Sequence, residues 1–286
     1  MRALRAIAVF IIGATAGPAC SLLVDTSGLV GDLAPGPEGG GDSAMAGDRA
    51  TPSSGDGDAP SADGSATCTA GAGRPFVSAG SYCVDRSEVT NADYDTFLAA
   101  RFVDPSGTAP GCAFDPSFAR KCQPLATGGD APVTCVNWCD ARAYCAWAGK
   151  RLCGRIGGGS QELADHTNAA TDQWYSACSA GGAKLFPYGA PYQPGRCNDL
   201  ARNAGKPLPV ASNAACVGGF DGLFDMSGNV QEWVNSCDGT SGAADKCAIR
   251  GGAFDDGNDG VGCTPAFPVA RDLADSTIGF RCCSNP

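Results

Sequence analysis

Two carboxylates flank a tight turn in the segment FDMSGNVQEW, residues 224–233. Asp225 and Glu232 are separated by the turn dipeptide Gly228–Asn229, and Trp233 follows directly. Carboxylates beside a turn can supply hard oxygen ligands together with the backbone carbonyls that the turn directs inward. Two interpretations are therefore open. Either the two acids hold a cation, or they accept hydrogen bonds from nearby amides with no ion present.

Cysteine is the second residue type that could carry chemistry. The chain has seventeen cysteines, and leaving out Cys20 gives sixteen, all between Cys68 and Cys283. In an exported protein disulfides are the default use of cysteine, and sequence alone cannot fix their connectivity. The spacing suggests three pairs, namely Cys237 with Cys247, Cys112 with Cys122, and Cys68 with Cys83.

Other kinds of functional site lack the residues that they need. His166 is the only histidine, and it lies in the glycine-rich stretch 157–170, where we expect an exposed loop without a catalytic role. No Gly-x-Ser-x-Gly motif accompanies it, and the glycine-rich segment 154–160 has no phosphate-loop lysine. The chain also has no run of Lys and Arg, which argues against nucleic acid as a partner.

The first residues predict a signal peptide over 1–19. Two arginines precede an apolar stretch, 7–16, that is too short to span a bilayer. The segment Gly17-Pro18-Ala19-Cys20 resembles a bacterial lipoprotein box and favours lipidation of Cys20. Alternatively, ordinary signal peptidase cleaves after Ala16, and Cys20 is simply the first cysteine of the mature chain. Both alternatives place the protein outside the cytoplasm, at the bacterial cell envelope.

Residues 20–67 are expected to form a disordered tether. From residue 25 onward they carry eight acidic residues against one basic residue, and few large apolar side chains. Such a segment cannot bury enough surface to offset the entropy of ordering it. Residues 68–286 are then one dense, cysteine-rich domain.

Within that domain three segments predict helices, each with a capping residue: Thr90 in 89–100, Asn137 in 136–153 and Thr171 in 171–182. Asp93 and Asp140 stand three residues after the first two caps, as in a capping box. Short strands are expected at 248–250 and 278–281. The remainder is rich in Gly, Pro and Asn, so long loops must be held by disulfides or bound ions.

Six stretches resemble, in order, the formylglycine-generating enzyme or sulfatase-modifying factor family. They are YCVDRSEVTNADYDTFLAA (82–100), PVTCVNWCDARAYCAWAGKRLC (132–153), LFPYG (185–189), GLFDMSGNVQEWV (222–234), RGGAF (250–254) and IGFRC (278–282). The resemblance implies an α+β fold related to C-type lectins, with little regular secondary structure and many disulfides.

The resemblance also implies calcium. At the turn, Asp225 and Glu232 would supply carboxylate oxygens, and Gly228 and Val230 would supply backbone carbonyls. This mixed oxygen set suits a calcium ion. A second site would use the Asn198 side chain and the Asp199 carbonyl, although the family's remaining ligands for that site have no counterpart in the segment that follows.

The family's enzymes oxidise a cysteine of a sulfatase to formylglycine with copper and oxygen, using two cysteines five residues apart. Here Cys263 is the single cysteine of the matching segment, Asn258 stands five residues before it, and Ala253 replaces a family serine. Asparagine cannot replace a soft thiolate ligand of copper(I), so copper is not expected. Cys263 is interpreted as a disulfide partner of Cys282 or Cys283, which as neighbours should have separate partners.

Two further expectations follow from the same segments. A sister branch of the fold uses a three-histidine iron site, which a chain with one histidine cannot build. Asp255, Asp256 and Asp259 lie in the segment that replaces the family's active site, where a solvated acidic loop is expected. A third cation site or a lip facing a ligand is the alternative.

The preferred hypothesis is a lipid-anchored, non-catalytic module that binds a protein, peptide or glycan at the cell envelope. It touches the membrane only through its lipid anchor. The alternative is a divergent formylglycine-generating oxidoreductase built around Cys263 and one of Cys282 or Cys283. The state of Cys263 distinguishes the two hypotheses.

Overall fold

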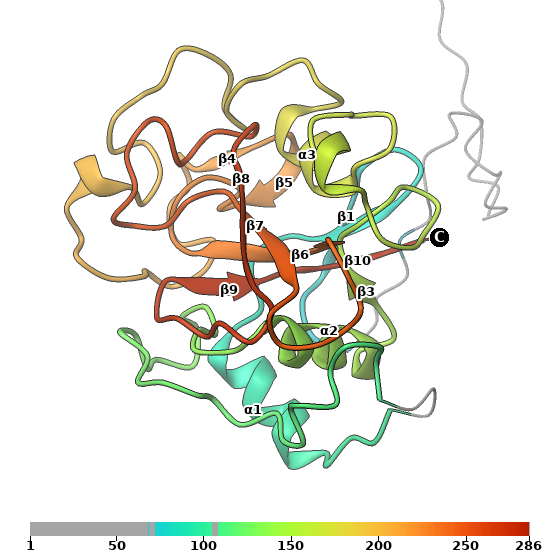
Figure 1. Ribbon diagram of the computed structural model, residues 1–286. Helices are drawn as coiled ribbons and strands as arrows, with labels where there is room; N and C mark the ends of the chain where they lie inside the picture. The colour runs from blue at the N-terminus through green and yellow to red at the C-terminus, as the bar shows by residue number, and fades with distance from the viewer. Residues whose placement is uncertain (1–67, 69–71, 105–107, 286) are drawn as a thin grey trace, which may run out of the picture. The chain divides into compact units, whose positions relative to one another are not determined.

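The computed structural model describes residue 68 and the segments 72–104 and 108–285. The expected signal peptide, the lipidation site Cys20 and the tether 20–67 lie outside these residues. In the described part, few helices, short strands and long connections form a disulfide-rich mixed α/β domain, as the sequence predicts (Figure 1). No helix of the described part is long and apolar enough to cross a membrane.

The first two predicted helices are confirmed, and each begins at its predicted cap. Helix α1, Asn91–Ala99, starts after Thr90, whose hydroxyl accepts from the Asp93 amide at 3.2 Å while the Asp93 carboxylate accepts from the Thr90 amide. Helix α2, Trp138–Trp147, repeats this capping box with Asn137 and Asp140. Both caps satisfy amides that the first helical turn would leave unpaired.

The third helix, α3, spans Gln173–Ser179 and is capped one residue later than predicted. The Asp172 carboxylate accepts from the Tyr175 amide at 2.7 Å. The hydroxyl of Thr171, the predicted cap, instead accepts from the side-chain amide of Gln161. Two single-turn 3-10 helices, η1 Leu163–Asp165 and η2 Leu200–Arg202, lie in the connections.

The strands form two four-stranded sheets and one two-stranded ribbon. The first sheet is antiparallel, in the order β1 (Phe76–Ser78), β2 (Cys83–Asp85), β10 (Cys282–Ser284) and β3 (Arg151–Leu152). The second has the order β8 (Ala266–Ala270), β7 (Lys246–Arg250), β6 (Gln231–Cys237) and β9 (Ile278–Phe280), with β6 and β9 parallel. The ribbon pairs β4 (Val217–Gly218) with β5 (Phe220–Phe224).

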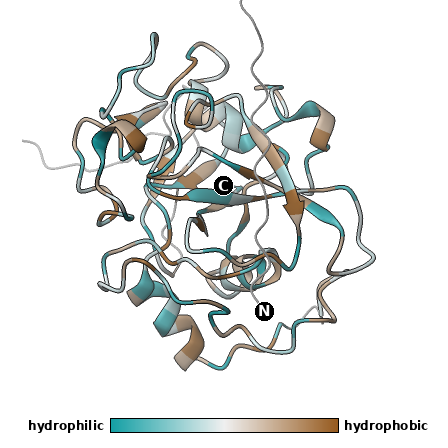
Figure 2. Ribbon diagram, turned by 60° about the vertical axis from the view of Figure 1, so that its left-hand side comes forward, coloured by the Kyte–Doolittle hydropathy of each residue, from teal (hydrophilic) through white to brown (hydrophobic). Residues whose placement is uncertain are grey.

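Side chains of the second sheet alternate between two cores. Trp233 and Ile249 pack with α1 and α2 in one cluster, whereas Val234 and Ala248 pack with α3 in the other. Figure 1 agrees, since α1 and α2 lie together on one side of the strands and α3 lies on the other. Hydrophobic stretches follow the central strands (Figure 2). This alternation, expected for a strand buried on both faces, fixes which side chains meet which helix.

Eight disulfides join all sixteen described cysteines. Two predicted pairs are confirmed, Cys68–Cys83 and Cys237–Cys247. One predicted pair is wrong, because Cys112 bonds to Cys139 and Cys122 to Cys135. The remaining bridges are Cys145–Cys282, Cys153–Cys283, Cys178–Cys263 and Cys197–Cys216.

Cys282 and Cys283 have separate partners, as expected, but neither bonds to Cys263. Adjacent residues of a strand point to opposite faces, so Cys282 joins the α2 core and Cys283 joins the α3 core. Cys263 lies in the loop next to α3 and meets Cys178 of that helix. The prediction for Cys263 is therefore wrong: β10 directs Cys282 into the other core, and Cys283, which shares the α3 core, is bonded to Cys153.

Candidate functional site

The turn before β6 places Glu232 in a fully enclosed ion pair. Its carboxylate accepts from the Arg281 Nη2 at 2.6 Å and from the Trp174 indole nitrogen at 2.8 Å. The Arg281 Nε lies 2.9 and 2.8 Å from the two carboxylate oxygens. Glu232, Arg281 and Trp174 are each about 1% exposed or less. Both oxygens of Glu232 are thus engaged by protein donors.

Asp225, the other predicted carboxylate, accepts from the Ala211 amide at 2.6 Å. It belongs to a pair with Glu88, which sequence reasoning missed. One oxygen of Glu88 accepts from the Asn229 side-chain amide at 2.9 Å, and the other has no protein donor. Burial raises the pKa of Glu88 well above its ordinary value, and the charges of Asp225 and Glu232 add to the shift. Burial likewise raises the pKa of Asp225 to about 6.

Asn198, from the second predicted site, lies beside the turn of the first predicted site. The Asn229 amide donates to the Asn198 carbonyl at 2.7 Å, and Asn198 forms a backbone bridge with Gly228. Gly228 has positive φ, and a Cβ there would collide with the Asn198 carbonyl oxygen. The buried Asn198 Oδ1 has no partner. The Asp199 carbonyl, the other predicted ligand, accepts from the Arg202 amide at 3.1 Å, and the Asp199 carboxylate accepts from the Tyr192 hydroxyl at 2.8 Å.

As placed, these residues do not fit a calcium ion. Calcium needs open carboxylate oxygens, whereas both oxygens of Glu232 already accept from Arg281 or Trp174. The guanidinium of Arg281 supplies the positive charge that calcium would bring. Among the described residues no group of three or more His, Cys, Asp or Glu side chains is arranged to hold a metal. Calcium at this turn stays a prediction of the family resemblance.

Cys263 lies in a second enclosed group, around Arg250. The guanidinium donates to the carbonyls of Cys263 and His166, both at 2.7 Å, and pairs with Asp172 at 3.3 Å. It also lies 4.7 Å from the Trp174 ring centroid, a cation–π contact. Cys263 and Arg250 are fully buried. These contacts therefore surround the Cys178–Cys263 bridge with protein groups.

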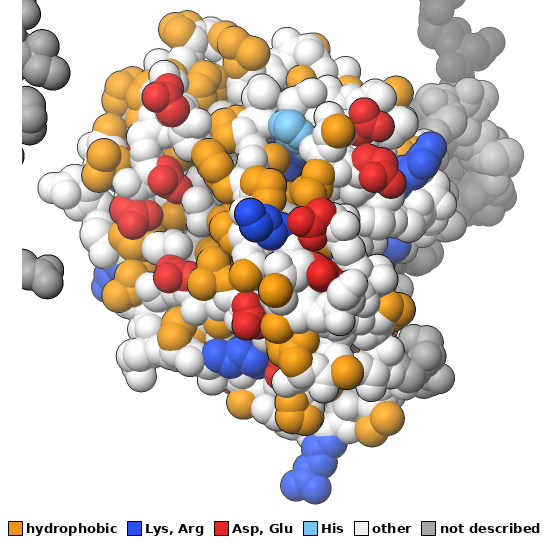
Figure 3. Space-filling model, viewed as in Figure 1, with side chains coloured by type: hydrophobic (Ala, Val, Ile, Leu, Met, Phe, Trp, Pro, Cys, Tyr) orange, Lys and Arg blue, Asp and Glu red, His pale blue; other side chains and the backbone are white. Residues whose placement is uncertain are grey.

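The residues around Cys263 do not recreate a metal-binding pair. Asn258 is exposed, and Ala253 is buried with its amide donating to the Asp256 carboxylate at 2.9 Å. Asp256 also accepts from the Gln231 side chain, whereas Asp255 and Asp259 are exposed. His166 is half-buried rather than exposed, and its ring nitrogen contacts the Leu163 carbonyl. On the face in Figure 3, the described charged side chains are scattered, without a cluster of Lys and Arg.

Two adjoining clefts, which we call the double cleft, open elsewhere on the domain. The first, with a volume of about 330 Å³, is lined by Phe102, Asp115 and the Cys112–Cys139 bridge, among others. The second, of about 400 Å³, is lined by Trp138, Cys237 and Arg271, among others. Ala109 and Arg142 line both. Each volume is in the range of clefts that hold small ligands.

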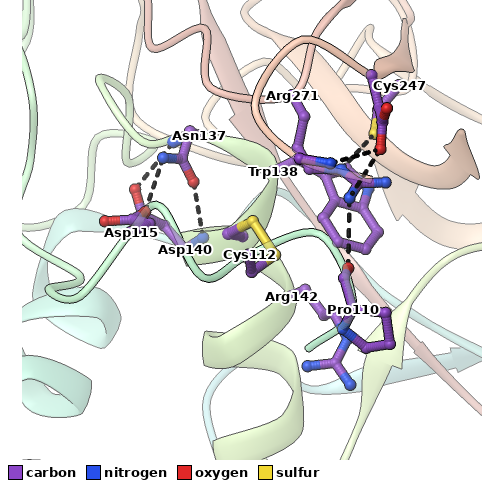
Figure 4. Close-up of a disulfide and its surroundings, with 12 residues drawn as sticks. Pro110, Cys112, Asp115, Asn137, Trp138, Asp140, Arg142, Cys247 and Arg271 are labelled. Atoms are coloured by element: carbon purple, nitrogen blue, oxygen red, sulfur yellow. Dashed lines mark hydrogen bonds and ion pairs between the residues drawn. A yellow bond between two sulfur atoms is a disulfide. The ribbon is translucent and has the colours of Figure 1, made fainter. Parts of the chain in front are cut away.

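Arg271 holds together groups that line the second cleft. Its guanidinium lies 4.9 Å from the Trp138 ring centroid and donates to the Pro110 carbonyl at 3.3 Å (Figure 4). It also contacts the sulfur of Cys247 and the carboxylate of Asp245. None of the predicted calcium ligands lines either cleft, and neither do Cys263 or Asn258. The lining residues come from several distant segments, so no local sequence signal marked this place.

The chain was compared with known families. The family model described as "Sulfatase-modifying factor enzyme 1-like domain" matches residues 57–286. The chain belongs to this family. The match covers the whole described part, so the six stretches found in the sequence mark a true family scaffold.

Individual relatives have different activities. The chain is 33% identical over 170 residues to "Inactive C-alpha-formylglycine-generating enzyme 2" of Bos taurus, covering 54% of this chain and 50% of that protein. It is 34% identical over 116 residues to formylglycine-generating enzyme of Mus musculus, covering 36% and 27%. It is 32% identical over 112 residues to hercynine oxygenase of Mycolicibacterium smegmatis, covering 38% and 22%. The chain thus spans at most about half the length of these relatives.

Among solved structures, PvdO from Pseudomonas aeruginosa is similar at 24% identity with a TM-score of 0.49, covering 72% of this chain and 80% of that one.

The residues of the matching segment determine whether the family's copper site could form in this chain. Copper(I) requires soft thiolate ligands, and all the described cysteines, 68 to 283, are in disulfides. At the matching segment the sulfur of Cys263 is bonded to Cys178, and Asn258 offers only an amide. The residues present do not fit a copper–thiolate centre.

Proposed function

We propose that this family domain is a non-catalytic module that binds a protein, peptide or glycan at the bacterial cell envelope. The observation that carries the proposal is the Cys178–Cys263 disulfide. This bridge engages the sulfur of Cys263, the one cysteine of the matching segment that could serve the family's oxidation chemistry. Family membership reports the scaffold, whereas activity depends on the residues of the site.

The surroundings of Cys263 support the same conclusion. A disulfide becomes a dithiol only if a reductant reaches it, and both Cys178 and Cys263 are fully buried. Arg250 holds the Cys263 carbonyl and the α3 cap Asp172 together. The alternative hypothesis, an oxidoreductase that pairs Cys263 with Cys282 or Cys283, lacks free partner thiols as well. Cys282 is bonded to Cys145, and Cys283 is bonded to Cys153.

Binding is supported by the double cleft. Its walls combine apolar rings, an amide at Asn235 and charged groups such as Glu162 and Asp238. Two disulfides meet its lining, Cys112–Cys139 through both of its cysteines and Cys237–Cys247 through Cys237. Cross-linked walls cost little further ordering when a ligand binds, which favours affinity.

Two further observations support this function and its location. A relative over half of this chain carries the name of an inactive formylglycine-generating enzyme, so a scaffold of this kind exists without the activity. Eight disulfides require an oxidising compartment, in agreement with export. A lipid on Cys20 would then hold the domain at a membrane surface through the tether 20–67.

Thiol mapping tests the proposal. The full-length protein is denatured without reductant, alkylated and mapped by mass spectrometry. We expect no alkylated cysteine between residues 68 and 283. Alkylation of both Cys178 and Cys263 would remove the observation on which the proposal rests and revive the oxidoreductase hypothesis.

Membrane extraction tests the anchor separately. Cys20→Ser should release the protein from membranes into the soluble fraction, with Cys68→Ser as a control that retains membrane association. Unchanged association of Cys20→Ser would rule out lipidation at that residue.

A further inference from the structure

The Cys237–Cys247 disulfide differs from the other bridges in its position. The two cysteines lie opposite each other on the neighbouring strands β6 and β7. They close the shortest segment of the eight bridges, with a sequence separation of 10. Because a short closed loop restricts the unfolded chain least, this bridge contributes less stability than the longer ones. The strand pairing also holds β6 and β7 together when the bridge is open.

Only one of its two cysteines lines the second cleft. Cys237 is half-buried and lines the second cleft, whereas Cys247 is fully buried. Thiol–disulfide exchange begins when a thiolate attacks one sulfur in line with the bond that breaks. An attacking thiolate in the cleft therefore meets Cys237, and Cys247 becomes the leaving group.

A positive charge stands beside the leaving sulfur. The Nε of Arg271 donates to the Cys247 sulfur at 3.5 Å, and Figure 4 shows the guanidinium between Cys247 and Trp138. The stacking on Trp138 and the bonds to Pro110 and Asp245 fix its position. A cation next to sulfur favours the thiolate over the thiol, and a better-stabilised thiolate leaves faster.

We propose that the Cys237–Cys247 bridge is a thiol-exchange site. A cysteine thiolate, carried by a small thiol or by another exported protein, attacks the Cys237 sulfur. The new bond joins that thiol to Cys237, and the electron pair of the broken bond leaves on Cys247 as a thiolate beside Arg271. One thiolate is consumed and one is formed, so no oxidant is needed. The reverse attack by Cys247 releases the partner and restores the bridge.

The Cys122–Cys135 disulfide is a matched control within the same chain. Its Cys122 is exposed, more so than Cys237, and its sequence separation of 13 is similar. Among the contacts of the described residues, no cationic side chain donates to either of its sulfurs. The neighbouring Lys121 is engaged by Asp140 and Asp115 instead. Exposure alone would make Cys122–Cys135 exchange first, whereas the cleft and the guanidinium favour Cys237–Cys247.

Native exchange decides between the two bridges. Oxidised full-length protein is treated with limiting glutathione, quenched with acid, alkylated and mapped. We expect glutathione on Cys237 and alkylated Cys247, appearing at least about tenfold faster than any product of Cys122–Cys135. Equal or faster opening of Cys122–Cys135, or glutathione on Cys247, would overturn the proposal. The thiol count of the untreated protein is independent of this result, so the proposed binding function stands or fails separately.

The role of Arg271 is tested with a matched variant. Arg271→Gln should slow exchange at Cys237–Cys247 about fivefold and leave Cys122–Cys135 unchanged. Arg202→Gln, which removes an exposed arginine that lines neither cleft, should alter neither rate. If Arg271→Gln does not fold, Arg271→Lys should retain faster exchange at Cys237 than at Cys122. An unchanged rate in a folded Arg271→Gln protein would contradict the assignment.

A second arm identifies the source of the thiol. A short peptide with a single cysteine replaces glutathione at the same thiolate concentration. Faster exchange with the peptide supports a protein partner, and equal or slower exchange supports a small thiol. Lack of reaction with both would overturn the exchange site.

Discussion

In two regions of this domain an arginine lies beside a disulfide, and its contacts with that disulfide differ. Around Cys178–Cys263, Arg250 bonds to backbone carbonyls and a carboxylate and encloses the bridge. At the double cleft, Arg271 donates to the sulfur of Cys247, whose partner Cys237 lines an open volume. We call these the sealed region and the open region. Two disulfides of one scaffold, each beside an arginine, can therefore have opposite access to a cleft.

The sealed region also contains the turn between Asp225 and Glu232. Glu232 and Arg281 form a buried pair there, and the indole of Trp174 completes the carboxylate's hydrogen bonds. Trp233, next in sequence, points to the other core and donates to the Val136 carbonyl. The two carboxylates and the tryptophan thus connect the turn to both faces of the sheet. In the open region the charged groups instead border a cleft of about 400 Å³.

The largest expected effect compares the two disulfides directly. Replacing Cys178 and Cys263 by serine removes a bridge with a sequence separation of 85, against 10 for Cys237 and Cys247. The loop-entropy relation gives losses of about 4.5 kcal/mol and about 2.7 kcal/mol, respectively. Urea unfolding of both double variants measures the difference. Equal losses would show that the sealed bridge adds no more stability than the open one.

A somewhat smaller effect concerns the buried charges. Arg281→Met leaves Glu232 without its cation in an enclosed site, so we expect a loss of about 3–4 kcal/mol in unfolding free energy. Arg142→Met, in the open region, removes a half-buried pair with Asp104 and should cost at most about 1 kcal/mol. Similar losses for both variants would remove the energetic distinction between the regions.

Glu88, beside the turn of the sealed region, should contribute to the pH dependence of stability, together with Asp140 and Asp85, whose pKa values burial also raises. The pKa of Glu88 is raised in the folded state, so the folded protein binds this proton more tightly than the unfolded chain. The corresponding stability is full below the unfolded pKa, near 4.5, and is lost as pH rises through the folded pKa. Glu88→Gln should flatten this slope and raise the melting temperature at pH 8. A variant as pH-sensitive as the wild type would contradict this.

Chelation should have the smallest effect. Because Arg281 already neutralises Glu232, we expect a calcium chelator to leave the melting temperature of the full-length protein unchanged. A decrease that disappears in the Asp225→Asn, Glu232→Gln double variant would instead show that calcium binds this turn, as the resemblance predicts. In that case magnesium, added after chelation as a control for general ionic effects, should not restore the melting temperature.

Local interactions account for what could be predicted from the sequence. The caps of α1 and α2 join residues three apart, and the short Cys237–Cys247 bridge closes a hairpin, so both are visible in a short window. The predicted cap of α3, Thr171, is wrong by one residue because its hydroxyl accepts a hydrogen bond from the side chain of Gln161, ten residues away. Nothing in a local segment reveals such competition for one hydroxyl.

Several tertiary features could not be predicted from the sequence. Cys263 meets Cys178 only because its loop lies against α3, and Cys282 is directed away from it by the pleat of β10. Glu88 gave no signal of its own, because it is one acid among several in the stretch 82–100. Its meeting with Asp225 depends on segments more than a hundred residues apart. The double cleft likewise joins segments that have no common pattern.

Copper(I) titration tests most directly whether the scaffold has lost the family's metal chemistry. The oxidised full-length protein is titrated with copper(I) in competition with a coloured copper(I) chelator, next to a control in which Cys178 and Cys263 are both replaced by serine. We expect neither protein to remove copper from the chelator. One copper(I) bound per chain, and lost in the double serine variant, would contradict the sealed disulfide and restore an oxidase at this position.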